Sequence, residues 1–401
     1  MSESKPSSSS PLPRRRVRRR EFLSTSGVGL GAAALSGLPG ILRAGALEGG
    51  GAPDKPGDKI RMGFIGVGGR GSTHLRNVLD TDGFEVTWVC DIDPTALDRA
   101  ANTVAGKAGK KPSSTEHHER VLEAKDVDAV LIATPCDVHA RLYLDTIKAG
   151  KDLYAEKPLC ITVADANAIV EAAEMSKCIV QVGFQSRYSP GIKDGVERVH
   201  RGDLGEIVEV RAAFLAPFGP LRGWFSKRAR SGDWMVEQAV HHWDILNWTL
   251  KGLPVSAYGA GRTDVFTEGE PDRDVHDYYT AILQWPDKVQ VDWLHTWLCP
   301  KGGAFGKSFI QIVGRKGTVD LLNGDVEYMD SSRPKEKIRG DEGNVDMTRL
   351  AHQAFLESVR TRKPPISNVR NGRDAVLIGL MVREAVYGRR VVTMDEIKKQ
   401  A

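Results

Sequence analysis

The sequence predicts an α/β protein with two domains, a parallel-sheet domain followed by an α+β domain. Three observations support this prediction. An apolar strand at residues 60–65 runs into a glycine-rich turn, and strand-like and helix-like segments alternate from residue 59 to about 184. Beyond residue 190, several strand-like segments are joined by connections too short for crossover helices. That second region therefore predicts a large mixed, mostly antiparallel sheet.

The glycine-rich turn places Gly66, Gly68 and Gly71 in a G-x-G-x-x-G pattern that also contains Gly69 and Arg70. The first glycine permits a tight turn, the second allows close approach of a pyrophosphate, and the third lets the following helix pack close to the strand. A helix N-terminus then faces the phosphates. A glycine-rich surface turn produces the same pattern, so its context decides between the two interpretations.

That context is a second apolar run, residues 84–90, which ends at Asp91, 25 positions after Gly66. A carboxylate at this place accepts hydrogen bonds from a ribose 2′-hydroxyl and repels a 2′-phosphate. The residues directly after Asp91 supply no cation. We therefore expect a Rossmann dinucleotide-binding domain over residues 59–184 that takes NAD(H) rather than NADP(H).

The elements expected in this domain alternate in type, as a parallel sheet with right-handed crossovers requires. Strands are expected near residues 60–65, 85–90, 128–133, 152–155 and 179–182, and helices near 70–80, 94–105, 138–149 and 163–176. The second domain, residues 185–401, is expected to hold helices near 190–201, 347–361 and 372–387, with strands near 207–214, 278–285, 288–298, 309–313 and 318–322.

Charge excludes some function classes. The chain has 56 Lys and Arg against 52 Asp and Glu, but residues 1–46 hold eight of the basic and two of the acidic side chains. The remainder therefore has 48 basic and 50 acidic residues, a balance that favours neither nucleic acid nor an anionic membrane.

The N-terminal segment resembles a Tat-type signal peptide over residues 1–46, with the twin arginines Arg19 and Arg20 before a moderately apolar run. Residues 47–58 are interpreted as a flexible linker. The expected location is periplasmic, and no membrane insertion of the mature chain is expected. Because export follows folding, an enzyme in that compartment would carry its NAD tightly bound.

Polar residues follow the ends of the predicted parallel strands. Because ligands bind at the carboxyl ends of such strands, Gly66, Asp91, Thr134, Pro135 and the Glu156-Lys157-Pro158 segment are expected along one crevice.

Several segments in this order resemble the Gfo/Idh/MocA family: Gly63-Phe-Ile-Gly-Val-Gly-Gly-Arg-Gly71, Ala133-Thr-Pro-Cys-Asp-Val-His139, Ala149-Gly-Lys-Asp-Leu-Tyr-Ala-Glu-Lys-Pro158, Gly183-Phe-Gln-Ser-Arg-Tyr-Ser-Pro190 and His241-His-Trp-Asp244. The resemblance covers roughly residues 59–390. It implies a Rossmann domain followed by an open-faced mixed sheet, with a sugar or polyol oxidised between the two.

The resemblance assigns catalytic roles to Lys157 and His241. An ammonium can stabilise the alkoxide that develops on the substrate, and an imidazole can accept the hydroxyl proton. Asp244 matches the aspartate that follows the family's histidine. Where the family usually has an aspartate four residues before that histidine, this chain has Glu237, whose role is either to orient His241 or to shape a different pocket. In a continuous helix from about residue 235, these three polar side chains would form one stripe.

Other residues match positions that the family places near cofactor or substrate. They are expected to bind the dinucleotide or line its site: Gly69, Arg70, His139, Glu156, Gln185, Arg187 and Trp224. Contacts at a domain interface are the alternative for Gln185, Arg187 and Trp224. A metal site is not expected, because Glu237, His241 and Asp244 have no further ligand cluster near them in the sequence.

The leading hypothesis is an NAD-dependent oxidoreductase that acts on a sugar or polyol. One alternative is a redox-neutral glycoside hydrolase or epimerase that oxidises and later reduces the same sugar. Another is a non-catalytic dinucleotide-binding module. The substrate cannot be identified from the sequence, and a homo-oligomer formed through the open sheet face is expected.

Overall fold

A computed structural model describes residues 58–266, 270–300, 305–338 and 345–400. The predicted signal peptide and nearly all of the predicted linker lie outside the described residues, so those two expectations stay predictions.

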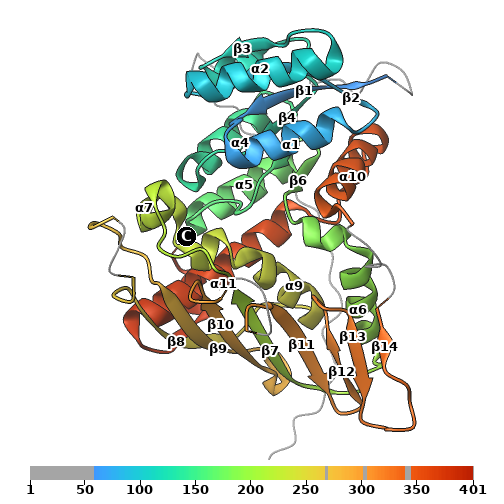
Figure 1. The fold of residues 1–401 in the computed structure, drawn as a ribbon, viewed down its shortest axis with the longest axis vertical. Coiled ribbons are helices and arrows are strands. Elements are labelled where there is room, and N and C mark those ends of the chain that lie inside the picture. Colours follow the sequence, from blue (N-terminus) through green and yellow to red (C-terminus); the bar gives the residue numbers. More distant parts are fainter. Residues whose placement is uncertain (1–57, 267–269, 301–304, 339–344, 401) are drawn as a thin grey trace, which may run out of the picture. The chain divides into compact units, whose positions relative to one another are not determined.

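The first domain is built on a six-stranded sheet with the order β3-β2-β1-β4-β5-β6 (Figure 1). Every neighbouring pair of strands is parallel. The order reverses between β1 and β4, which is where ligands bind in doubly wound sheets. The strands are β1 (Ile60–Ile65), β2 (Phe84–Cys90), β3 (Ser113–Thr115), β4 (Ala129–Ile132), β5 (Asp152–Ala155) and β6 (Val180–Val182).

Helices connect these strands, and local capping explains where two of them begin. The Asp93 side chain accepts a hydrogen bond from the Thr95 N–H ahead of α2, and Thr162 caps α5 in the same way. The helices are α1 (Gly69–Leu79), α2 (Pro94–Ala108), α3 (His118–Glu123), η1 (Cys136–Val138), α4 (His139–Lys148) and α5 (Val163–Met175). Neither β3 nor α3 was predicted from the sequence, because both are too short to show a clear periodicity.

The second sheet has nine strands in the order β14-β13-β12-β11-β7-β10-β9-β8-β15. Among the described strands of this sheet, β7 and β10 pair in parallel and the other neighbours are antiparallel. The predicted α/β class with a mixed, mostly antiparallel second sheet is therefore confirmed. The strands are β7 (Ile207–Leu215), β8 (Ser256–Arg262), β9 (Tyr278–Gln284), β10 (Gln290–Thr296), β11 (Phe309–Gly314), β12 (Gly317–Asp320), β13 (Asp325–Tyr328), β14 (Glu336–Lys337) and β15 (Val392–Thr393).

Helices cover one face of this second sheet, as Figure 1 shows for α9 and α11. On β10 the side chains alternate, with Val291, Trp293 and His295 buried beneath the helices and Asp292 and Leu294 on the opposite face. The remaining helices are η2 (Gln185–Tyr188), α6 (Pro190–Arg201), η3 (Gly223–Ser226), α7 (Arg228–Ser231), α8 (Trp234–Glu237), α9 (Val240–Leu250), η4 (Pro286–Lys288), α10 (Met347–Thr361), α11 (Val369–Gly388) and α12 (Met394–Lys398).

Helix α10 returns from the second half of the chain to the first domain. Its Ala351, Phe355 and Val359 belong to the same buried core as Leu75 and Val78 of α1. The first domain therefore needs a helix that lies more than 150 residues beyond its own last strand in the sequence.

The helix expected from residue 235 onward is interrupted, which corrects the single polar stripe considered above. Helix α8 ends at Glu237 and α9 begins at Val240. In a continuous helix the Met235 carbonyl would accept the N–H of residue 239. Here it accepts the indole N–H of Trp243 at 2.9 Å, and the Ala239 N–H bonds to Trp234 instead. The direction of the Glu237 side chain is therefore not fixed by the helical geometry of α9.

A buried ion pair holds α9 against the segment that leaves the first sheet. Arg187 on η2 donates to both carboxylate oxygens of Asp244 on α9, at 2.7 and 2.8 Å. The Arg187 residue is 6% exposed and Asp244 is fully buried. Removing one partner of such a pair leaves an uncompensated charge inside the protein.

We expect Asp244→Ala to lower the free energy of unfolding by about 3–5 kcal/mol, because Arg187 stays buried without its partner. The double variant Arg187→Met/Asp244→Leu should lose much less, since no charge is then buried. Guanidinium denaturation measures both. Glu206→Ala, which removes the exposed partner of Arg315, is the control. An Asp244→Ala loss no larger than that of the control would show that the buried pair does not hold α9 in place.

Candidate active site

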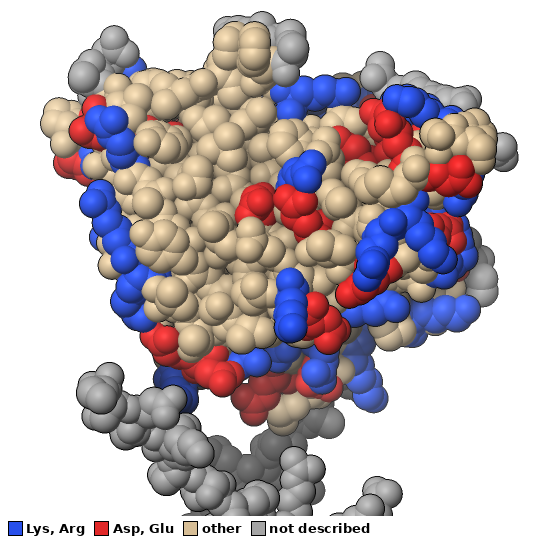
Figure 2. All heavy atoms as spheres, turned by 90° about the horizontal axis from the view of Figure 1, so that it is seen from below, with Lys and Arg blue, Asp and Glu red and all other residues tan. Residues whose placement is uncertain are grey.

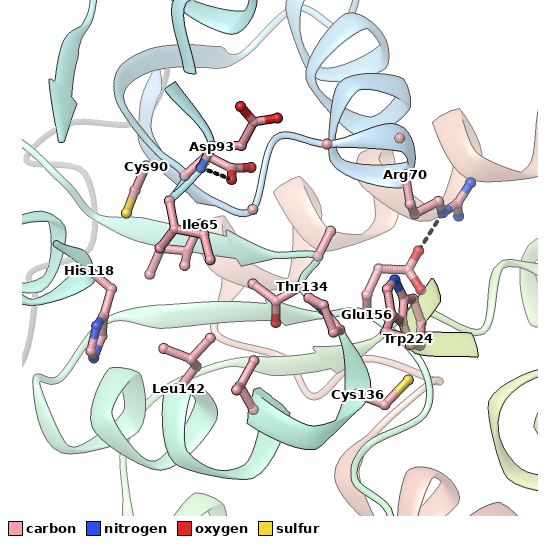
Figure 3. A pocket seen from close by; sticks show the side chains of 18 of the residues that line it. Ile65, Arg70, Cys90, Asp93, His118, Thr134, Cys136, Leu142, Glu156 and Trp224 are labelled. Carbon is pink, nitrogen blue, oxygen red and sulfur yellow. Dashed lines mark hydrogen bonds and ion pairs between the residues drawn. The ribbon is translucent and has the colours of Figure 1, made fainter. Parts of the chain in front are cut away.

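A pocket of about 780 Å³ lies at the carboxyl ends of β1, β2, β4 and β5 (Figure 3). It is the crevice that the strand order predicts. Its lining includes most of the residues singled out in the sequence, namely Gly66, Gly68, Gly69, Arg70, Asp91, Thr134, Pro135, Glu156, Lys157, Trp224 and Glu237.

The glycine turn has the shape that a dinucleotide pyrophosphate requires. Gly66 has a φ of +84°, and a Cβ there would meet the Ala133 carbonyl oxygen at 2.6 Å. A Cβ on Gly71 would lie 2.0 Å from the Gly66 oxygen, so only glycine allows α1 to begin so close to β1. Beside Gly68 and Gly69, by contrast, an added Cβ would meet no atom within 4 Å in the described part of the chain, apart from the neighbouring residues of the turn and helix. This open space adjoins the N-terminus of α1 and suits a phosphate.

Asp91 lies at the end of β2 and is held in place by two backbone donors. Its carboxylate accepts the Val67 N–H at 2.8 Å and the Asp93 N–H at 3.0 Å. Both oxygens keep lone pairs for ribose hydroxyls. The pocket lining also contains His118 and Arg141. These two side chains were not predicted from the sequence, because they come from α3 and α4 rather than from the residues after Asp91.

Glu156 carries a negative charge that three nearby residues stabilise. Its Oε1 accepts from Arg70 Nε at 2.7 Å and from His74 Nε2 at 2.6 Å, and its Oε2 accepts the Lys157 N–H at 2.8 Å. Burial acts to raise its pKa, but Arg70, His74 and Lys157 hold the pKa of Glu156 well below its usual range. Figure 3 shows the Arg70 guanidinium turned toward Glu156 at the pocket. The carboxylate is thus bound to the protein itself, and His74 is a partner that no sequence pattern indicated.

Lys157 follows directly and reaches across to α8. Its ammonium donates to the backbone oxygen of Glu237 at 2.7 Å and forms a short ion pair with the Glu237 carboxylate. Burial acts to lower the pKa of Lys157, but Glu237 and Glu156 raise it, so the ammonium stays charged. An ammonium has three donors, and these contacts use two of them.

His241, near the beginning of α9, is half-buried with its ring edge-on to Phe184. Its Nδ1 is buried without a hydrogen-bond partner in the described part of the chain. Burial, and after it the Lys157 charge, lower the pKa of His241 well below the usual value, so the ring is neutral at physiological pH. The two roles considered for Glu237 from the sequence both stay predictions; its carboxylate and its backbone oxygen both contact the Lys157 ammonium.

Six of the expected site residues are not among those that line the pocket: Gly71, His139, Gln185, Arg187, His241 and Asp244. Asp244 and Arg187 bind each other in the interior. The two ring nitrogens of His139 lie 2.9 and 2.7 Å from the carbonyl oxygens of Thr134 and Pro158, so this histidine ties together the two segments that form the pocket wall. Asp244, Arg187 and His139 thus match family positions in sequence, but their side-chain hydrogen bonds are to other groups of the protein.

Aromatic side chains complete the pocket on the side of the second domain. Trp224 stacks on Phe225 with ring centroids 3.7 Å apart, and both belong to η3. Cys136 and Arg230 also line the pocket. Phe225 and Arg230 were not predicted from the sequence, although adjacent aromatic residues in a loop are a usable signal for a ligand contact.

The described ranges contain no group of three or more His, Cys, Asp and Glu side chains placed to hold a metal ion. Within the same ranges, every helix is too short or too polar to cross a bilayer.

Curated relatives align with about half of the chain or with most of it. Inositol 2-dehydrogenase 3 of Saccharopolyspora erythraea is 37% identical over 202 residues, which is 49% of this chain and 56% of that protein. A glycosyl hydrolase family 109 protein of Shewanella pealeana is 31% identical over 217 residues, 50% of this chain and 46% of that protein. The chain thus spans about half the length of these curated relatives. Myo-inositol 2-dehydrogenase of Thermotoga maritima aligns over 84% of this chain and 99% of its own length, at 22% identity.

Solved structures share the fold over most of the chain. A levoglucosan dehydrogenase in complex with NADH and levoglucosan superposes with a TM-score of 0.74 at 18% identity, over 84% of this chain and 100% of that one. A probable dehydrogenase from Thermotoga maritima gives 0.70 at 20% identity, with the same coverage of both chains.

Two family models match consecutive parts of the chain. Residues 60–184 match the oxidoreductase family model with an NAD-binding Rossmann fold, and residues 196–320 match the GFO/IDH/MocA C-terminal domain. The glycine turn and Asp91 described above agree with that cofactor. The chain therefore belongs to the Gfo/Idh/MocA family of oxidoreductases and has an NAD-binding Rossmann domain.

Proposed function

We propose that the protein oxidises a CH–OH group of a sugar or polyol, with NAD as the hydride acceptor. The observation that carries this proposal is the Lys157 ammonium, which Glu237 fixes at the pocket with one donor left for a substrate oxygen. The names of the relatives, inositol dehydrogenases among them, support the substrate class.

Lys157 supplies electrostatic stabilisation. Because two of its three N–H groups are bound to Glu237, the third has a restricted direction and can donate to the hydroxyl oxygen of a substrate. That oxygen gains negative charge as the C–H bond breaks, and a donor already in place costs no reorganisation at that moment. Glu237 thus acts through Lys157, with its longer side chain in place of the family's usual aspartate.

His241 accepts the hydroxyl proton. A base must be unprotonated before it acts, and the lowered pKa of His241 keeps the imidazole neutral even below its usual titration range. In the described chain no carboxylate contacts its ring, so the imidazolium formed after proton transfer is acidic and returns the proton readily.

The NAD site is formed by groups that bind and orient. Gly66, Gly68 and Gly71 shape the turn for the pyrophosphate, and Asp91 is placed for the ribose. When bound, NAD supplies the hydride acceptor, which no side chain can provide.

We expect Lys157→Ala and His241→Ala to lower turnover by about 10² to 10⁴, the range for losing one electrophilic or acid–base group. NAD affinity should change little, because the glycine turn and Asp91 are untouched. Sugar-dependent NADH formation and NAD titration of the purified protein measure the two quantities. Lys193→Ala and His200→Ala are controls that remove the same side chains on α6, outside the pocket. Near-normal turnover in Lys157→Ala or in His241→Ala would remove that residue from the mechanism.

We expect Asp91→Ala to relax the preference for NAD over NADP, because the carboxylate both accepts from the ribose 2′-hydroxyl and repels a 2′-phosphate. Asp93→Ala is a matched control, since Asp93 caps α2 and lines the same pocket. Dissociation constants for both cofactors provide the measurement. An unchanged ratio of the two constants in Asp91→Ala would refute the assignment.

A redox-neutral reaction is the second candidate, and the relatives named glycosyl hydrolase family 109 favour it. The same lysine and histidine would serve an oxidation that is later reversed on the same sugar. Assays with sugars and aryl glycosides separate the two functions. Accumulating NADH supports the oxidoreductase, whereas aglycone release without net NADH supports the hydrolase.

We also propose that the open face of the second sheet pairs with a second copy of the chain. Figure 2 shows this side of the molecule as a broad area with few charged side chains. A shallow hollow there is lined by residues including Tyr258, Thr280, Ile282, Leu294 and Phe309. The hollow also contains Asp292 and the paired Glu209 and Arg211, and a broad face with so few charges is typical of an interface.

We expect the wild-type protein to be a homo-oligomer and Ile282→Glu to dissociate it, because the charge would be buried at the proposed interface. Ile282 is 50% exposed on β9, and Ile366, 52% exposed and outside the sheet, is the matched control as Ile366→Glu. Light scattering coupled to size exclusion gives the mass. A monomeric wild type, or equal behaviour of the two variants, would overturn the proposal.

A further inference from the structure

Two buried histidines continue the hydrogen-bond network behind Lys157. His74 on α1 places its Nε2 2.6 Å from Glu156 Oε1 and its Nδ1 2.8 Å from His352 Nε2 on α10. None of these three residues is more than 3% exposed. Neither histidine has a part in the proposed mechanism. The sequence did not predict their contact, because the two residues are 278 positions apart.

The donors in this chain of contacts follow from the charge on Glu156. An ionised carboxylate only accepts, so the His74 Nε2 must carry a proton and donate it to Glu156. Burial acts first to lower the pKa of both histidines, so each ring is neutral. A neutral His74 then has a bare Nδ1, which accepts, and His352 must donate from its Nε2–H. The His352 Nδ1 is left as an acceptor, buried without a partner in the described chain.

The network ends at the catalytic lysine. While Oε1 of Glu156 takes His74 and Arg70, its Oε2 accepts the backbone N–H of Lys157. The ring of Tyr154 packs edge-on against both imidazoles, with centroids 5.3 and 5.1 Å away. Helix α10 is thereby linked, through His352, His74 and Glu156, to the backbone N–H of Lys157.

We propose that His74 and His352 are positioning residues for Lys157. The two rings, each locked as the Nε2–H tautomer, hold the Glu156 carboxylate ionised and in one orientation, and that carboxylate fixes the lysine at the end of β5. The expected effects on kcat rest on the proposed function of Lys157. The expected tautomers of His74 and His352 do not depend on that function.

Other charged and titratable groups face the network. Arg70 from α1 and Lys157 from the end of β5 both favour the ionised Glu156. Asp346, just before α10, acts on Arg70 and His74. The Tyr143 hydroxyl from α4 donates to the Glu156 backbone oxygen at 2.6 Å, and Tyr154 lies on β5. Arg70 and His74 both donate to Oε1 of Glu156. Loss of His74 therefore leaves that oxygen with Arg70 as its donor.

The first test compares two amides at position 352. In His352→Gln the amide nitrogen can occupy the place of Nε2 and keep the donor to His74, whereas in His352→Asn the shorter amide matches Nδ1 and cannot reach. We expect His352→Asn to lower kcat about ten- to hundredfold with little change in KM, the range found when partners behind a metal-binding side chain are removed. His352→Gln should retain most of the wild-type kcat. His200→Asn, a histidine exposed on α6, is the control.

The second test is the pH dependence of kcat. Loss of a donor raises the pKa of Glu156, so the carboxylate protonates at higher pH as the solution is acidified. In His74→Leu the acid limb of the kcat profile should therefore move toward neutral pH. The double variant His74→Leu/His352→Leu should be no worse than His74→Leu alone, because the two histidines act in series.

The third test needs no activity. Nitrogen NMR of histidine-labelled, full-length protein should show both rings as neutral Nε2–H tautomers. A charged ring, or an Nδ1–H tautomer in His74, would overturn the inference whatever the enzyme does. Equal kcat in His352→Asn and His352→Gln, with unshifted pH profiles, would also overturn it. If instead Lys157→Ala keeps normal turnover while the tautomers are as stated, the proposed function fails and the network stands.

Discussion

The contact between Lys157 and Glu237 is the interaction on which the rest of the site depends. Lys157 ends the segment after β5 in the first domain, and Glu237 ends α8 in the second. A charge-assisted bond between them sets where the two domains meet beside the pocket. Because the helix breaks between Glu237 and Val240, the carboxylate is free to face the lysine while α9 follows its own packing. One local irregularity therefore determines the geometry of the proposed catalytic donor.

Buried charges of the interior are arranged in pairs on both sides of this contact. Glu156 is satisfied by Arg70 and His74, and Asp244 by Arg187. Ion pairs in the interior contribute little net stability, because desolvation offsets their attraction, but a missing partner is costly. They specify geometry instead: the first holds the end of β5, and the second holds α9. The geometry of the site thus depends in part on His74, Arg187 and Asp244, which do not line the pocket.

Much of the fold could be predicted, because glycine turns, strand alternation and helix periodicity are local properties of a sequence. The pocket residues at strand ends, such as Gly66, Asp91 and Lys157, followed from the rule that parallel strands present their carboxyl ends together. The sequence did not predict the directions of several side chains or the contacts between residues far apart in the chain. Asp244 and Arg187 bind each other, and the His74–His352 contact joins residues 278 positions apart. No local pattern records such pairings, since they depend on tertiary packing.

The central claim is that the pocket removes a hydride from a sugar carbon while Lys157 and His241 handle the hydroxyl. Transfer of deuterium tests it most directly. Purified protein is given NAD and fully ring-deuterated myo-inositol or glucose, and the nicotinamide is analysed by mass spectrometry. We predict that one deuterium is retained in the reduced nicotinamide of the wild type, as net oxidation requires, and that the amount falls with Lys157→Ala. Turnover of a deuterated sugar by the wild type with no label in the nicotinamide would contradict the claim.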